Sequence, residues 1–284
     1  MADATGSGGY KHAIAREWNR AAEGWHAWVP FVRSWLREPT ERMLDRAAIT
    51  LGSRVLDVAA GDGDQSIDAA RRAGPGGSVV AIDTAAEMLR LAVETAHAAG
   101  LTIETQVMDA ESLSFADASF DAAISRLGMM YCQSPGGAFR ELRRVVVPGG
   151  RVAVIVFATA EQNPFFSIPV SLIRRRLATS PPAAGTPGPF ALGAPGALRR
   201  ALEAGGLVEV DVEAIEAPVR MASAAECVRF RREASGTLGA MMAPMDESTR
   251  EATWAEMHRE LSAFETAGEF VSPCTVLLGS ATVP

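Results

Sequence analysis

The stretch RVLDVAAGDGDQS, Arg54–Ser66, decides the fold class of this chain. Its first part is a short apolar run, which is typical of a buried strand, and it ends in a turn of small residues. A helix is predicted to follow the turn. This order of strand, glycine turn and helix is typical of a nucleotide-type cofactor site. The turn is unusual because it carries three carboxylates, Asp57, Asp62 and Asp64, and no lysine.

Strand and helix signals continue to alternate on the carboxyl side of this stretch. Further strands are predicted at 78–83, 102–109, 120–126 and 151–158, and helices at 64–74, 85–100 and 137–146. Continuous apolar strands that are separated by helices indicate a parallel sheet covered on both faces. The sequence therefore predicts a doubly wound, Rossmann-like α/β fold.

The segments on either side of this core have a different character. Residues 14–36 look helical and hold four of the five tryptophans, so this helix either packs on the main body or covers a pocket as a lid. Residues 181–196 are too rich in proline and glycine for regular structure and predict a long loop. Beyond the loop we expect an extended stretch at 207–219, helices at 224–242 and 247–264, and a last strand at 274–283. We divide the chain into an N-terminal helical lid (1–45), a cofactor-binding core (46–160) and a substrate-side region with strands that complete the sheet (161–284).

The composition limits the classes of function. The chain has 284 residues, of which 48% are hydrophobic, so it can bury a full core. Its formal net charge of -7 opposes a general nucleic-acid role. The cysteines, Cys132, Cys227 and Cys274, lie far apart, so we expect reduced thiols and no metal site. The opening residues do not resemble a secretory signal, and no apolar run approaches the roughly 20 residues of a membrane helix, so we expect a cytoplasmic protein.

Polar residues stand where the predicted strands end, which is where ligands bind in open α/β sheets. Gly61 and Gly63 would let the backbone approach a ligand closely. Asp83 follows Gly63 by 20 residues, a position from which a carboxylate can accept two hydrogen bonds from a ribose diol. Asp109 could accept from an adenine amino group while the amide of Ala110 reads a ring nitrogen.

The three carboxylates of the turn indicate which ligand charge this site would accept. A dinucleotide pyrophosphate would be repelled by Asp57, Asp62 and Asp64. The third glycine of the dinucleotide motif is also missing, since Ser66 holds its place. S-adenosylmethionine carries a sulfonium and an ammonium and no phosphate, so it suits an acidic turn better.

Five motifs in order resemble those of class I S-adenosylmethionine-dependent methyltransferases, in particular the small-molecule branch that includes the ubiquinone and menaquinone C-methyltransferases. They are VLDVAAGDGD, VVAIDTAAEML, VMDAESLSF, SFDAAISRLGMMY and VPGGRVAVIVFA. The resemblance covers roughly residues 54–157. It implies a seven-stranded sheet whose last strand is antiparallel. It also implies that Asp57 and Gly61 flank the methionine moiety, Asp83 holds the ribose, Asp109 and Ala110 read the adenine, and Arg126 lies between cofactor and substrate. Ala59 departs from the pattern, which often has glycine there.

These considerations give a set of expected site residues. The expected cofactor-binding residues are Asp57, Ala59, Gly61, Gly63, Asp83, Thr84, Met88, Asp109, Ala110 and Arg126. The expected substrate-binding residues are Trp25, Met129, Met130, Tyr131 and Asn163, although the methionines could equally pack in the core and Asn163 could start a turn. For catalysis we expect Arg126 and, as a base, His26, for which a structural or exposed position is an equal alternative.

The predicted function is methyl transfer from S-adenosylmethionine to a small, apolar or aromatic molecule by in-line displacement, in a biosynthetic reaction. A protein of this fold that binds the cofactor without transferring its methyl group, as a cyclase or a binding module, is an alternative. An NAD-dependent oxidoreductase is a weaker one. The sequence leaves open whether oxygen, nitrogen or carbon is methylated and whether the chain forms a homodimer.

Overall fold

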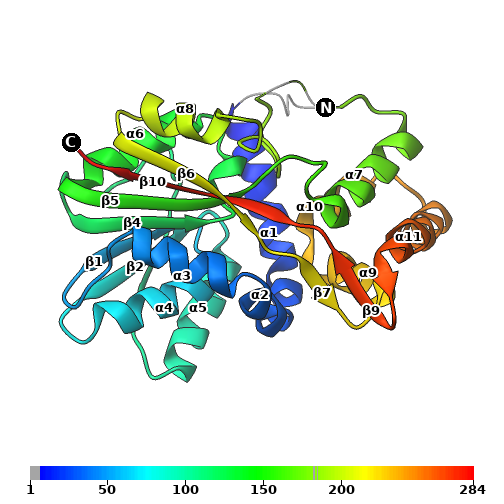
Figure 1. Ribbon diagram of the computed structural model, residues 1–284, viewed down its shortest axis with the longest axis horizontal. Coiled ribbons are helices and arrows are strands. Elements are labelled where there is room, and N and C mark those ends of the chain that lie inside the picture. Colours follow the sequence, from blue (N-terminus) through cyan, green and yellow to red (C-terminus); the bar gives the residue numbers. More distant parts are fainter. Residues whose placement is uncertain (1–6, 182, 184) are drawn as a thin grey trace.

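A seven-stranded sheet forms the centre of the computed structural model, which describes residues 7–181, 183 and 185–284 (Figure 1). The strands follow the order β3-β2-β1-β4-β5-β10-β6. All neighbouring pairs are parallel except those of β10, which runs antiparallel to both β5 and β6. The sheet confirms the predicted fold class and its antiparallel last strand. Its strands are β1 (Arg54–Val58), β2 (Ser78–Asp83), β3 (Glu104–Val107), β4 (Phe120–Arg126), β5 (Val146–Phe157), β6 (Val208–Glu216) and β10 (Thr275–Thr282).

Helices cover both faces of this sheet (Figure 1). One face is covered by α3 (Arg37–Arg46), α4 (Asp64–Ala73) and α5 (Ala86–Ala98), and the other by α6 (Pro135–Val145) and α8 (Ala197–Ala204). Two of these helices have clear local signals at one end. Ser134 accepts a hydrogen bond from the amide of Gly137 as the N-cap of α6, and Gly74 ends α4 with a positive φ.

A second group of elements lies beyond one end of the sheet. It contains α7 (Pro164–Leu177), α9 (Ala224–Ala234), α10 (Gly236–Met242), α11 (Glu247–Leu261) and a small antiparallel sheet of β7 (Val219–Met221), β9 (Glu269–Ser272) and β8 (Glu265–Thr266). The N-terminal helix α1 (Ser7–Ala27) runs between this group and the main sheet (Figure 1), and it packs against α5, α9 and α10.

Two predicted helices are each divided in the structure. The tryptophan-rich segment forms most of α1 and all of α2 (Val29–Trp35), with a break at Trp28, two residues before Pro30. The helix expected at 224–242 is interrupted at Ser235, whose side chain accepts from the amide of Leu238 and so starts α10. The small sheet was not predicted, because β7 and β9 pair across about fifty residues of sequence.

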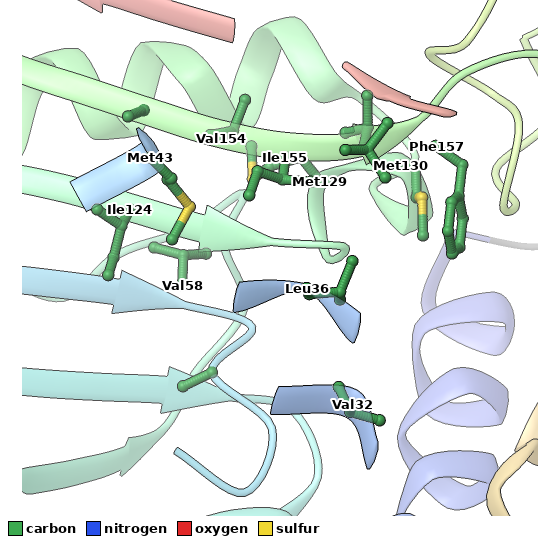
Figure 2. Packing of buried hydrophobic residues seen from close by; sticks show 14 of the residues in the cluster. Val32, Leu36, Met43, Val58, Ile124, Met129, Met130, Val154, Ile155 and Phe157 are labelled. Carbon is green, nitrogen blue, oxygen red and sulfur yellow. The ribbon is translucent and has the colours of Figure 1, made fainter. Parts of the chain in front are cut away.

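The hydrophobic core is continuous from the sheet to the N-terminal helices (Figure 2). Val154 and Ile155 of β5, Ile124 of β4 and Met43 of α3 are all fully buried in this cluster. Burial at this level contributes about 1.5–3 kcal/mol for each large side chain. The core therefore holds α2 and α3 firmly on the sheet, and α1 leads out of them toward the carboxyl ends of the strands.

Helix α1 approaches α9 so closely that a glycine is required. A methyl group on Gly24 would overlap the carbonyl oxygen of Glu233 on α9. We expect Gly24→Ala to lower the free energy of unfolding by about 1–2 kcal/mol, because overpacking costs about 1–3 kcal/mol and alanine returns up to about 1 kcal/mol of helix propensity. Gly239→Ala on α10 is the matched control, since its added methyl meets no atom within 4 Å. Urea denaturation of both variants measures the effect, and equal stabilities would contradict the close contact.

Candidate cofactor and substrate site

A cavity lies at the carboxyl ends of β1, β2 and β4, with α1 along one side. Its wall on the sheet side contains the turn after β1 and the residues that follow β2 and β4. One face of α1 supplies Tyr10, Lys11, Ile14, Trp18 and Trp25. The tryptophan-rich helix thus both packs on the body of the protein and covers a cavity, as the two interpretations of its sequence allowed.

The turn after β1 has the backbone geometry of a ligand cradle. Ala59 and Gly61 both have positive φ angles, of 53° and 58°. Nothing lies within 4 Å of the position that a side chain on Gly61 would occupy, so the backbone there faces open space. Ala59 takes a conformation that glycine adopts more easily, which is the physical cost of its departure from the expected pattern. Its methyl group fits because Gly128 stands opposite, where a further methyl would overlap it.

Asp83 holds this turn in place. Its Oδ2 accepts a hydrogen bond of 3.0 Å from the amide of Gly61, and its Oδ1 accepts one of 2.9 Å from the amide of Ala85. Each carboxylate oxygen keeps a second lone pair for a ligand. Burial raises the pKa of Asp83 above its usual value, and these backbone bonds oppose the shift. The expected ribose-binding carboxylate is therefore also a structural member of the turn.

The other acids of the motif have separate surroundings. Asp57 is fully buried, accepts hydrogen bonds from Ser66 and Gln65, and has its pKa raised to about 7 by burial. Asp62 lines the cavity, and its Oδ2 lies 3.1 Å from Nδ1 of His26. Burial also raises the pKa of Asp62. Asp64 points elsewhere and forms ion pairs with Arg33 and Arg126.

The part of the cavity next to the end of β3 contains an ion-paired lysine. Lys11, the only lysine of the chain, lies 2.6 Å from Oδ2 of Asp109 and 3.1 Å from Oε2 of Glu111. Oδ1 of Asp109 accepts from the amide of Glu111. A ligand amino group at Asp109 would therefore share this carboxylate with Lys11, which ties α1 to the strand edge.

Comparison with known proteins agrees with this geometry. Residues 55–150 match the model of a family described as methyltransferase domain. The matched segment, residues 55–150, is therefore the part of the chain that resembles a methyltransferase domain. A segment of 117 residues is 38% identical to the ubiquinone/menaquinone biosynthesis C-methyltransferase of Ralstonia pickettii, covering 41% of this chain and 48% of that protein. A segment of 109 residues is 42% identical to an uncharacterised protein of Mycobacterium bovis, covering 38% and 39%. These alignments span less than half the length of either relative.

The fold of most of the chain recurs in solved structures. A putative methyltransferase from Bacillus halodurans superposes with a TM-score of 0.58 at 19% identity, covering 87% of this chain and 99% of that one. In the described residues, no helix is long and apolar enough to cross a membrane. The same residues contain no group of three or more histidine, cysteine, aspartate or glutamate side chains that could hold a metal ion.

The residues of the methyltransferase domain fit S-adenosylmethionine. The open cradle at Gly61, the carboxylate of Asp83 and the acids at either end suit a ligand with a ribose, an amino-bearing base and a cationic end. Of the expected cofactor-binding residues, eight line the cavity: Ala59, Gly61, Asp83, Thr84, Met88, Asp109, Ala110 and Arg126. Asp57 and Gly63 lie behind it. Gly63 starts α4 with a positive φ, and a side chain there would collide with Ala92 of α5.

A second, aromatic cavity adjoins the cofactor cavity of the methyltransferase domain. The two cavities share Trp18, Trp25, Leu127 and Tyr131 as walls. Most of the remaining wall of the second cavity comes from β5, α7, α9 and α10, which contribute phenylalanines and Arg231, and Trp35 of α2 and Met130 complete it. Trp25, Tyr131 and Met130, all expected to contact substrate, line this second cavity.

The structure does not bring Met129 and Asn163 to either cavity. Met129 is fully buried in the core (Figure 2), which is the alternative that its sequence allowed. Asn163 is also fully buried, and its amide nitrogen donates to the carbonyls of Thr159 and Thr275 while its oxygen accepts from the amide of Thr275. These bonds fasten the end of β5 to β10, so Asn163 has the structural position of its turn.

Several residues of the two cavities were not found from the sequence. Lys11 and Glu111 lie 100 residues apart, so no local pattern predicts their ion pair. Gln65 lines the cavity because it lies in the first turn of α4, where its amide donates to Asp57 and to the carbonyl of Ala60. Arg231 belongs to a run of arginines and glutamates on α9 that is typical of a solvated helix face, and only the structure shows that it is buried.

Proposed function

We propose that the protein transfers a methyl group from S-adenosylmethionine to a small molecule with an apolar or aromatic body. The observation that supports this most directly is the shared wall of Trp18, Trp25, Leu127 and Tyr131 between the cofactor cavity and the aromatic cavity. A ligand in the second cavity would lie next to the methionine end of the first. When bound, the cofactor supplies a methyl group on a sulfonium, which an aligned nucleophile can displace.

In this proposal the protein contributes mainly alignment and the exclusion of water. Asp83 and Asp109 orient the nucleoside, and the open backbone of the turn at Gly61 leaves room for the methionine portion. Both cavities are lined by large apolar side chains, which keep water from the region between them. A substrate that is enclosed in this way needs little further help when its nucleophile is already acidic.

Two side chains were expected to take part in catalysis, and we propose positioning roles for both. His26 contacts Asp62, which lines the cofactor cavity, so it would orient that carboxylate toward the cationic end of the cofactor. Arg126 donates to Thr40 at 3.0 Å and pairs with Asp64 at 2.9 Å, so it would fix the end of β4 beside the cofactor. We also propose the lid, core and substrate-side regions as functional units, with α1 as the lid.

Titration calorimetry with S-adenosylhomocysteine, with NAD as the control ligand, tests the cofactor part of this proposal. We expect micromolar binding of the first and none of the second. Incubation with methyl-labelled S-adenosylmethionine and a panel of small phenols, enols and amines then tests transfer. Binding of NAD alone would overturn the proposal. Binding of the cofactor with no labelled product from any acceptor would favour a cyclase or a binding module.

A further inference from the structure

Arg231 is a buried arginine that faces the aromatic cavity. It lies on α9, and only 5% of its surface is exposed. Its guanidinium is centred 4.0 Å from the ring of Phe166 and 5.8 Å from that of Phe165. One nitrogen, Nη2, donates a long hydrogen bond of 3.4 Å to Ser235, and Nε has no hydrogen-bond partner.

The charge of Arg231 has no counter-ion within the part of the chain that the structure describes. None of the carboxylates described lies within 4 Å of its guanidinium, whereas the adjacent Arg232 pairs with Glu251 at 2.6 Å. Burial lowers the pKa of Arg231 to about 10, so the group stays cationic at neutral pH. An isolated buried charge is costly, and proteins normally pair such a group with an anion. A guanidinium with five donors is therefore left almost unused at the cavity wall.

The surroundings of Arg231 indicate what kind of anion would fit. The same cavity is lined by Trp25, Phe157, Phe166, Phe230 and Tyr131, so only a ligand with an apolar or aromatic body would fill it. The planar fork of a guanidinium matches a carboxylate, which it can bind through two parallel hydrogen bonds. The ring of Phe166 lies 4.0 Å from the centre of this guanidinium and so limits its movement at the cavity wall.

We propose that the substrate carries a carboxylate on its apolar or aromatic body, and that Arg231 binds this carboxylate inside the aromatic cavity. This inference rests on the proposed function, because it assigns the substrate class of the same site. Arg231 acts as a specificity-determining residue. The free protein tolerates its unpaired charge, and an anionic substrate gains affinity by neutralising it.

Matched pairs of small aromatics test the proposal in the full-length protein. Benzoate and trans-cinnamate are titrated against their neutral counterparts, benzyl alcohol and cinnamyl alcohol, with and without saturating S-adenosylhomocysteine. We expect at least one carboxylate to bind about tenfold or more tighter than its alcohol, the strength of a charged hydrogen-bonded contact. Arg231→Met should remove this preference and leave the affinity for the alcohol within about threefold. Arg232→Met, the same change at the adjacent exposed arginine, should preserve it.

Thermal unfolding of the ligand-free variants distinguishes a binding role from a structural one. Arg231→Met should keep or raise the melting temperature, because methionine fills a similar volume without an unpaired charge. A melting temperature lowered by more than a few degrees would show that Arg231 is a structural residue and overturn the proposal. Three titration results would also overturn it: tighter binding of the alcohols than of the carboxylates, an equal loss of affinity for carboxylate and alcohol in Arg231→Met, or no measurable binding of either member of any pair. Failure of S-adenosylhomocysteine to bind would instead contradict the proposed function, and the titrations without it still test Arg231.

Discussion

Asp64→Asn is expected to lower the free energy of unfolding by about 3–5 kcal/mol, the usual cost of leaving a buried charge without its partner. The side chain of Arg126 is 5% exposed, and that of Asp64 is 3% exposed. Their ion pair of 2.9 Å joins the end of β4 to the first turn of α4, and Arg126 also donates to Thr40 of α3. Without Asp64, Arg126 would keep only a neutral hydroxyl as a close partner.

Asp68→Asn is the matched control for this prediction. Asp68 lies one turn further along α4 and pairs with Arg33 at 2.5 Å and Arg71 at 2.9 Å, but its side chain is 28% exposed. Pairs of this kind contribute about 0–1 kcal/mol. Urea denaturation at pH 7 compares the two variants with the parent protein. An equal loss of unfolding free energy in the two variants would mean that water screens the Asp64–Arg126 pair as it screens an exposed one. Replacing both partners with apolar residues should recover most of the loss, since neither charge then remains buried.

The sequence predicted the parts of the fold that local patterns encode. The strands around the glycine turn are continuous apolar runs and the helices between them have clear ends, so the alternation of strands and helices, and with it the fold class, followed from them. The helix breaks at Trp28 and Ser235 were missed. Pro30 is tolerated in the first turn of α2, so it marks a possible helix start without requiring one. A serine such as Ser235 can stand inside a helix as well as cap one, so its sequence position alone does not predict a new helix. The pairing of β7 with β9 depends on contacts far apart in the sequence, which no local pattern records.

The residues of the candidate site also divide into those that local sequence patterns predict and those that depend on contacts between distant segments. Asp83 and Asp109 could be placed because the carboxyl ends of parallel strands meet at one edge of a sheet. Lys11 and Arg231 could not, because each reaches its cavity from a helix whose packing the sequence does not specify. For Met129 and Asn163 the sequence allowed either contact with the substrate or a structural position. Both side chains are fully buried, so both positions are structural.

Asp83→Asn is expected to weaken the binding of S-adenosylhomocysteine by about 10- to 100-fold, equivalent to roughly 1.5–3 kcal/mol for a hydrogen bond to a charged group. Two effects combine in this loss. An amide cannot accept both hydroxyls of a ribose diol, and its NH₂ would also face the amide of Gly61 if it replaced Oδ2. The turn would then lose the bond that holds its cradle open. Titration calorimetry measures the affinity directly.

Asp121→Asn is the control for this prediction. Asp121 lies near the start of β4 and pairs with Arg54 at the start of β1, at the end of the sheet opposite the cavity. It should leave the affinity unchanged, and unchanged affinity in Asp83→Asn would remove Asp83 from the cofactor site. The two variants should also differ in stability. Burial raises the pKa of Asp83, so its ionised form opposes folding at neutral pH, and a neutral amide relieves that cost, which offsets the loss of the bond to Gly61. Asp121 has its pKa lowered by Arg54, so its ionised form favours folding. A variant that binds the cofactor poorly and yet unfolds no more easily would show that the carboxylate of Asp83 serves the ligand at the expense of the fold.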